Sequence, residues 1–232
     1  MFLPTAVEHS YERIPFATIV IGVALVVVAI ATGFSPDEST LLTYALVPSA
    51  FQVHQLVTAA FLHLGVIHLV FNLCFLWIFG RYVEDRLGAW RFAVVYLACA
   101  VFGNLVQLAV GGAAVALGAS GAIAGLLGYV LVAAPWAQVR CILLIPGPAL
   151  GRPVEIGAGW LLGVWVVLQL VEASLGSMSD VAVGAHLGGF ALGAEGAAFM
   201  RSARCKGTGW YIDPRPPTGG RAAVDRLHRA RA

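Results

Sequence analysis

Long apolar stretches, separated by short segments that carry almost all of the charge, form the main pattern of this 232-residue chain. The first stretch begins after Arg13 and holds no charged residue before Asp37, so it is long enough to cross the roughly 30 Å of hydrocarbon in a bilayer. Five further apolar blocks cover residues 66–80, 92–110, 119–136, 157–174 and 182–200. We therefore expect an all-α fold, in which six transmembrane helices form the bundle of a polytopic membrane protein.

The blocks divide the chain into a cytoplasmic N-terminus (1–13), a six-span membrane domain (14–200) and a basic cytoplasmic tail (201–232). The composition agrees with this division, because 59% of the residues are hydrophobic and 11% are charged, against about 25% charged in a soluble domain. We expect the tail to be solvated and poorly ordered, with a weak attraction to anionic lipid as the alternative. The net charge of +2 gives no reason to expect a nucleic-acid partner.

The basic residues predict the orientation in the membrane. None of the 14 Lys and Arg residues falls in the loops after the first, third and fifth blocks, where Asp37, Glu38 and Asp180 lie. Because Lys and Arg near the ends of spans are retained in the cytoplasm, these loops are predicted to be external. With six spans both termini are then cytoplasmic, and we expect an integral protein of the cell membrane.

Polar side chains are costly inside a bilayer, so those within the predicted spans mark candidate functional sites. The segment "HLGVIHLVFN" holds His63, His68 and Asn72. His68 and Asn72 are four residues apart and share one helix face, whereas His63 is expected where the external loop enters the second span. A single histidine in such a place can equally make a buried hydrogen bond between helices.

The segment "GASGAIAG" (118–125) holds Ser120 in a stretch of 48 residues without a charged side chain. A serine among small residues is most often packing material between transmembrane helices. Gly118 and Gly121 also permit a turn that leaves the hydroxyl and the following backbone N–H groups accessible at a helix N-terminus. Such a place can stabilise an oxyanion.

The segment "AHLGGFALG" holds His186 near the external end of the sixth span, followed by Gly189 and Gly193. The G-x-x-x-G spacing predicts close packing against a neighbouring helix. Ser120 begins the fourth span on the same external side, so the hydroxyl and the imidazole can lie at one depth. A serine becomes nucleophilic beside a base. Apart from Asp180 in the preceding loop, no carboxylate is expected close to His186 in the external half of a span, so the residues favour a dyad over a triad.

These residues resemble the motifs of the rhomboid family of intramembrane serine proteases. Any one motif alone is weak, but their order and placement agree over about residues 10–200, and "GRYVEDRLG" (80–88) is similar to the cytoplasmic turn after the second span of the family. The matching motifs are H-x-x-x-x-H-x-x-x-N from His63 to Asn72, G-x-S-G from Gly118 to Gly121 and A-H-x-x-G-x-x-x-G from Ala185 to Gly193.

The resemblance implies hydrolysis of a peptide bond within or beside the transmembrane segment of a membrane-protein substrate, in the lipid bilayer and without a cofactor or metal. It implies that Ser120 is the nucleophile and that His186 is the general base and then the general acid. By the same resemblance, His68 and Asn72 hold the oxyanion with the Ser120 backbone N–H, and His63 supports the site from the loop side.

Glu84 matches an acidic residue of the family after the second span, for which the resemblance implies a structural role. Two positions differ from the pattern of many members. His54 and Gln55 stand where W-R is common in the external loop, which puts the membrane anchoring of the loop in question. Ala124 stands where some members place a tyrosine that stacks on the catalytic histidine, so another group has to orient His186.

Two other classes of function fit parts of the sequence. A rhomboid relative that binds membrane clients without cutting them is the first, although such proteins lose the serine or the histidine. A metal site or transporter built on the histidines (His54, His63, His68 and His186) is the second, although no H-E-x-x-H motif and no adjacent carboxylate supports zinc. Glu195, in the cytoplasmic half of the sixth span, has no assigned role.

Overall fold

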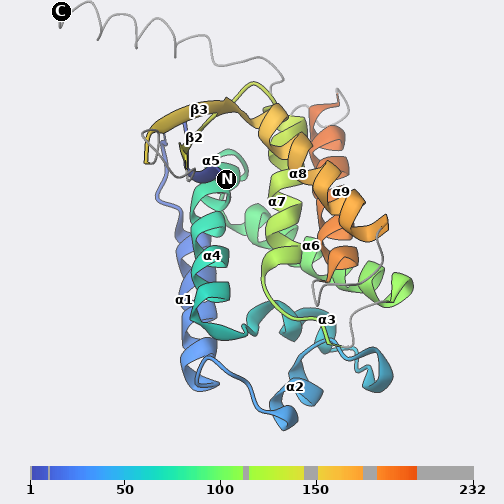
Figure 1. Ribbon diagram of the computed structural model, residues 1–232. Coiled ribbons are helices and arrows are strands. Elements are labelled where there is room, and N and C mark those ends of the chain that lie inside the picture. Colours follow the sequence, from blue (N-terminus) through green and yellow to red (C-terminus); the bar gives the residue numbers. More distant parts are fainter. Residues whose placement is uncertain (1, 10, 112–114, 144–150, 175–181, 203–232) are drawn as a thin grey trace, which may run out of the picture.

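The computed structural model describes residues 2–9, 11–111, 115–143, 151–174 and 182–202. Helices dominate it, and each of the six apolar blocks contains one (Figure 1). The helices are α1 (Phe16–Ala31), α2 (Glu38–Tyr44), α3 (Gln55–Thr58), α4 (Gly65–Phe75), α5 (Arg81–Leu87), α6 (Ala89–Val110), α7 (Ser120–Ala133), α8 (Ala158–Ser174) and α9 (Val183–Arg201), with the 3-10 turns η1 (Pro48–Ala50) and η2 (Ala59–Phe61) and the π-helical turn η3 (Leu76–Gly80).

Two helical segments of the described residues are long and apolar enough to cross a bilayer by themselves. One is Gly65–Leu87, in which α4, η3 and α5 run on continuously, and the other is α6. Three apolar helices, α1, α7 and α8, are shorter, and α9 is in neither group because it carries Glu195 and several glycines. The count of six spans therefore remains a prediction. At 1.5 Å per residue the 14 residues of α7 extend about 21 Å, a length that suffices for a helix enclosed by protein.

The central helix is α7, which packs against α9 and α6 (Figure 1). Glycines permit this packing. A Cβ atom at Gly189 would overlap the carbonyl oxygen of Gly121, and a Cβ atom at Gly193 would overlap that of Gly125. The close packing that the sequence predicts for residues 182–200 against residues 119–136 is thus present, with backbone against backbone.

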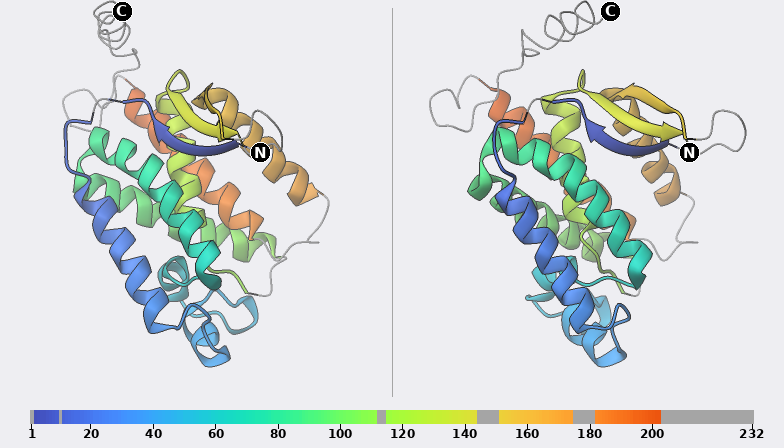
Figure 2. Two further views of the ribbon diagram at one scale, coloured as in Figure 1. Left: turned by 60° about the vertical axis from the view of Figure 1, so that its left-hand side comes forward. Right: turned by 90° about the vertical axis from the view of Figure 1, so that its left-hand side faces the viewer.

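A small antiparallel sheet corrects the all-α prediction. It consists of β1 (Phe2–Val7), β2 (Gln138–Leu143) and β3 (Pro153–Gly157) in the order β1-β2-β3, and it lies at one end of the helix bundle (Figures 1 and 2). Alternation explains β2, because Val139 and Cys141 are buried, whereas Gln138 and Arg140 are exposed and Ile142 is half-buried. Part of the expected N-terminal segment 1–13 is therefore a strand. The tail after residue 202 lies outside the described residues.

Two carboxylates join the N-terminal segment to α5. Glu84 is buried, and its two carboxylate oxygens accept hydrogen bonds from the backbone N–H groups of Ala17 and Thr18 at 2.8 and 2.7 Å. These donors lie in the first turn of α1, where no helical carbonyl is available. Asp85 accepts from the backbone N–H groups of Glu12 and Arg13. Glu84 therefore has a structural contact in this fold, since it caps α1.

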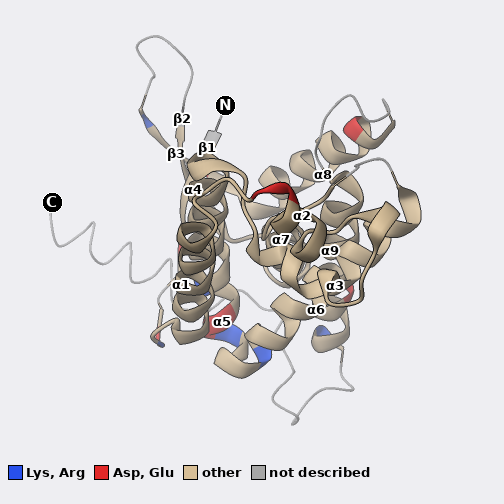
Figure 3. Ribbon diagram, turned by 90° about the horizontal axis from the view of Figure 1, so that it is seen from below, with Lys and Arg blue, Asp and Glu red and all other residues tan. Residues whose placement is uncertain are grey.

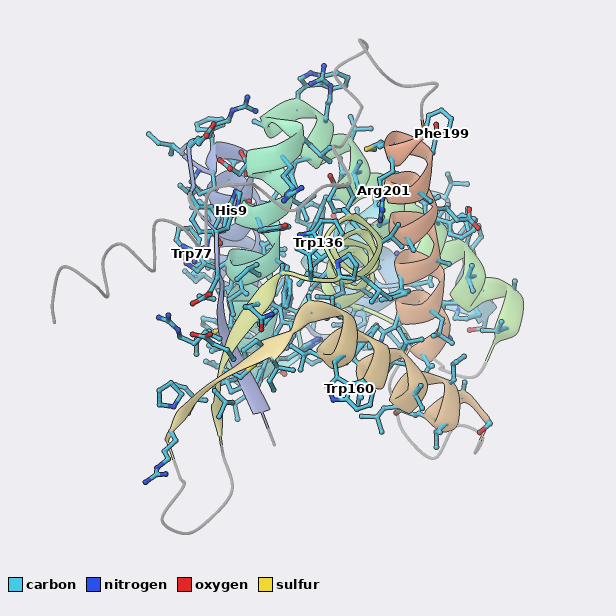
Figure 4. The ribbon with its side chains drawn as sticks, turned by 90° about the horizontal axis from the view of Figure 1, so that it is seen from above. His9, Trp77, Trp136, Trp160, Phe199 and Arg201 are labelled. Atoms are coloured by element: carbon cyan, nitrogen blue, oxygen red, sulfur yellow. The ribbon has the colours of Figure 1, made fainter. Side chains whose placement is uncertain are left out.

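The flanks of the bundle are apolar, as expected for a surface in contact with lipid. Few charged segments interrupt the ribbons in Figure 3, and blue segments gather beside α5. At the sheet end, Figure 4 shows the exposed aromatic side chains of Trp77, Trp160 and Phe199 at the periphery. Arg201 lies over Trp136 and donates to the carbonyl oxygen of Val132, near the last turn of α7. Such aromatic residues favour the interface between lipid and water.

The segment between α1 and α4 lies at the opposite end of the bundle and contains α2, η1, α3 and η2 (Figure 1). Gln55, at one of the positions that differ from the family pattern, is fully buried. Its amide oxygen accepts from the Val47 N–H at 3.3 Å, and its amide nitrogen donates to the Leu42 carbonyl at 2.8 Å. His54 contacts the Thr43 carbonyl at 2.7 Å. These two side chains stabilise the segment by hydrogen bonds to its own backbone.

Candidate active site

Ser120 is the first residue of α7, where the chain turns into the central helix. Gly118 makes this turn with φ +117°, a conformation that side chains other than glycine rarely adopt. A Cβ atom at Gly118 would also lie 2.8 Å from Cε1 of His68. Glycine at this position therefore provides both the turn and the space that lets the His68 ring lie beside the serine.

His186 lies in the first turn of α9, directly across from Ser120. Its Nε2 atom is 2.8 Å from the Ser120 hydroxyl oxygen, which is hydrogen-bond distance. Gln107 of α6 fixes the start of α9, because its amide oxygen accepts from the Ala185 N–H at 3.2 Å while its nitrogen donates to the Gly111 carbonyl at 2.7 Å. The two side chains that the sequence expects at one depth are thus in contact.

The residues of the "HLGVIHLVFN" segment lie beside this pair. His68 and Asn72 are on α4, and the Asn72 amide nitrogen donates to the His68 carbonyl oxygen at 3.0 Å. His63, just before α4, is fully buried, and its ring lies edge-on to the His68 ring with centroids 5.1 Å apart. Its Nδ1 atom donates to the Phe61 carbonyl at 3.3 Å. Burial, with a smaller contribution from His68, lowers the pKa of His63 to about 4, so this ring is neutral at pH 7.

A cavity of about 460 Å³ brings the candidate residues together. Ser120 and His186 form its inner wall, and His68 and Asn72 face them from α4. The rest of the wall is apolar and comes from Leu64, α4, α7, the segment 115–117, Trp165 of α8 and Ala182. This volume suits a short stretch of extended peptide in a largely apolar environment.

Two side chains of α8, for which the sequence predicts no role, contact His186. Gln169 places its amide oxygen 2.7 Å from Nδ1 of His186. The Trp165 ring is tilted against the imidazole with ring centroids 6.2 Å apart. Ala124, at the position where some family members have a tyrosine that stacks on the histidine, is buried in α7. Gln169 and Trp165 contact the His186 ring instead. The available signal was a glutamine inside an apolar span, where polar side chains need a partner.

Several other candidate residues do not join the cavity wall. His54 contacts the loop backbone at Thr43, and Glu195 is exposed on α9. Within the described ranges, no three His, Cys, Asp or Glu side chains come close enough together to hold a metal ion. Asp180 lies outside these ranges.

Two comparisons relate the chain to known proteins. A family model described as "Rhomboid domain" matches residues 50–202. A curated relative named "Rhomboid-like protease 3", from Toxoplasma gondii, is 32% identical in an alignment 160 residues long that covers 60% of this chain. The match spans 61% of the length of that relative. Because the family model covers more than half of the chain, this protein is a member of the rhomboid family.

Proposed function

We propose that this protein is an intramembrane serine endopeptidase that cleaves the transmembrane or juxtamembrane segments of other membrane proteins by a Ser–His dyad. The observation that carries the proposal is the 2.8 Å contact between the Ser120 hydroxyl oxygen and Nε2 of His186 at the wall of the cavity. A serine beside an imidazole at this distance is the arrangement of an activated nucleophile. The alternative, a relative that binds clients without cutting them, gains no support from this contact.

The contact supports the following proposed order of chemical steps. His186 Nε2 takes the hydroxyl proton of Ser120 while the serine oxygen attacks the carbonyl carbon of the scissile bond. The tetrahedral intermediate collapses when the imidazolium donates that proton to the leaving amine, and the acyl-serine remains. Water, deprotonated by the same Nε2 atom, then attacks the acyl carbon. When this second tetrahedral intermediate collapses, the imidazolium returns the proton to the Ser120 oxygen, and the acid product leaves with the hydroxyl and the neutral imidazole restored.

The oxygen of the intermediate needs hydrogen-bond donors, and three candidates surround Ser120. The first is the backbone N–H at the beginning of α7, where negative charge is favoured. The second is Asn72, because its amide nitrogen has two hydrogens and one bond, to the His68 carbonyl, accounts for a single hydrogen. The third is the His68 imidazole, which lies beside Gly118. Together they form the proposed oxyanion site.

The remaining features define the proposed setting. The catalytic cavity lies within an apolar bundle, so the proposed partners are the bilayer and substrates with a transmembrane helix. We also propose cytoplasmic termini in the cell membrane. Arg140 and Arg152 on the sheet side and Asp37 and Glu38 on the opposite side fit this orientation.

The decisive experiment compares the wild type with Ser120→Ala on a panel of single-span membrane proteins in proteoliposomes. We expect the wild type to cleave some of them and Ser120→Ala to cleave none, because the variant lacks the nucleophilic oxygen. A fluorophosphonate probe should label the wild type at Ser120 and miss the variant. Labelling at another residue would contradict the assignment, and client binding without cleavage by the wild type would favour the alternative.

A further inference from the structure

Four polar side chains form a continuous chain from the cavity to the outer end of α8. The Ser120 hydroxyl oxygen is 2.8 Å from Nε2 of His186, and Nδ1 of the same ring is 2.7 Å from the amide oxygen of Gln169. The Gln169 amide nitrogen then donates to a carboxylate oxygen of Glu172 at 3.3 Å. Gln169 and Glu172 are three residues apart, so both lie on one face of α8.

Glu172, the last residue of this hydrogen-bonded series, determines which group donates in each of its hydrogen bonds. A carboxylate only accepts hydrogen bonds, so Glu172 requires the NH₂ group of Gln169 on its side. The amide oxygen then faces His186, and because that oxygen only accepts, Nδ1 of the imidazole carries the proton. The lone pair of the neutral ring is therefore on Nε2, beside the Ser120 hydroxyl. This is the tautomer that a general base for Ser120 requires.

We propose that Gln169 is a positioning residue for His186 and that Glu172 acts through it by orienting the amide. The inference rests on the proposed function and extends it, since the dyad becomes the inner half of a four-residue chain. Gln169 selects the tautomer, holds the plane of the ring and stabilises the imidazolium through the amide dipole. Its place at the back of the ring corresponds to the third member of a hydrolytic triad.

The packing around His186 supports such a role. Ala124 offers no ring for stacking, and the Trp165 ring, at 6.2 Å between centroids, touches one side of the imidazole without a hydrogen bond. Without the bond to Gln169, the imidazole could rotate or adopt the other tautomer, in which Nε2 carries the proton and cannot accept one. A misplacement of about 1 Å at such a group can lower the rate about a hundredfold.

The first part of the test is Gln169→Leu, which keeps the approximate size and removes the acceptor. We expect kcat to fall about tenfold to a hundredfold while KM changes little, because the side chain acts on His186 and not on the substrate. Labelling of Ser120 by the fluorophosphonate probe should slow to a similar extent. Leu168→Ala, at an exposed neighbouring position of α8 (59% exposed), is the matched control and should keep wild-type activity and melting temperature.

The second part exchanges the two side chains, Gln169→Glu together with Glu172→Gln, so that the donor and the acceptor between them are swapped. The new carboxylate still accepts from Nδ1 of His186, and we expect kcat within about threefold of the wild type. Because a carboxylate favours the charged imidazole, the acidic limb of the pH–kcat/KM profile should move to higher pH by about one unit. A side chain at position 169 that packs the helix without contacting Nδ1 of His186 would not move this limb.

The outcomes separate this inference from the proposed function. If Ser120 is labelled but Gln169→Leu reacts at the wild-type rate with an unchanged melting temperature, the positioning role is wrong while the protease assignment stands. If Gln169→Leu fails to fold, the exchanged variant decides, and an unmoved acidic limb refutes the role. If the wild type is not labelled at Ser120, the proposed function itself fails.

Discussion

The helices α7 and α9 form one side of the Ser120 cavity, and α4 and α8 form the other. The inner helices are well buried, since α7 buries 11 of its 14 residues and α9 buries 8 of its 19. The outer helices are more exposed. In α4, 2 of 11 residues are buried, and in α8, 2 of 17 residues are buried, both of them near the first turn of α8. The bundle thus fixes Ser120 and His186 and leaves the flanking walls exposed to lipid.

This difference bears on how a substrate reaches the site. Segments with few buried contacts open at a lower free energy than the core does. Under the proposed function, a transmembrane substrate that approaches sideways from the bilayer would therefore displace α4 or α8 more easily than α7 or α9. Ser120 and His186 are on the two well-buried helices. Gln169, on the outer helix α8, contacts His186 through a hydrogen bond, whereas the Asn72 amide donates within its own helix α4, to the His68 carbonyl oxygen.

The largest effect is expected from a valine at the contact between the inner helices α7 and α9. In Gly189→Val the new side chain would overlap the Gly121 carbonyl oxygen and force α9 away from α7. The Ser–His contact tolerates little displacement, so we expect activity to fall by about a hundredfold or more, although no catalytic group changes. The measurement is cleavage of a transmembrane reporter, together with the melting temperature.

The matched control places the same substitution in α8, one of the two outer helices. Gly163 is in α8, and no atom lies within 4 Å of an added Cβ atom there. Gly163→Val should keep most of the activity, since the helix cost of a valine is similar in both variants. Full activity in an inserted Gly189→Val protein would mean that His186 does not depend on this packing.

A smaller effect is expected from a substitution in the outer helix α4, at Asn72. In Asn72→Ala the proposed oxyanion donor is lost, and we expect kcat to fall about a hundredfold, because one such donor contributes roughly 3 kcal/mol to the transition state. KM should change much less, since the bond strengthens as charge develops on the oxygen. Val70→Ala, at an exposed position of α4, is the control. An unchanged kcat in Asn72→Ala would leave this residue with a packing role.

The sequence predicts the positions of the helices and the approach of α9 to α7 because these follow from local patterns. Apolar blocks mark the spans, and the spacing of Gly189 and Gly193 marks a close contact. The family resemblance added roles for Ser120 and His186, whose side chains the structure brings within hydrogen-bond distance. Each of these patterns can be recognised within its own segment of the sequence, without knowledge of which segments pack together.

The features that the sequence did not reveal depend on partners far along the chain. The strand β1 pairs with β2, in which Phe2 lies opposite Leu143, and no periodicity within either segment specifies that pairing. Gln169 and Gln107 were likewise visible as polar residues in apolar spans, but their partners, His186 and Ala185, lie on another helix. Hydrogen bonds between helices are set by the packing and not by the local pattern.

The smallest effect concerns His63, the buried histidine just before α4. Its pKa is lowered to about 4 in the folded protein by burial, with a further contribution from His68, whereas an unfolded histidine titrates near about 6.5. Between these values the unfolded chain binds more protons at this site, so the free energy of unfolding falls as the pH falls through this window. The stability is fully present above about pH 6.5.

The measurement is the melting temperature in detergent at about pH 7 and about pH 5, on either side of the unfolded pKa. The wild type should lose several degrees on acidification, about the size that a 1 kcal/mol change produces. His63→Gln keeps an amide that can donate to the Phe61 carbonyl and has no proton to gain, so its melting temperature should fall less. An equal loss in both proteins would mean that His63 is solvated in the folded state or that other groups dominate the acid response.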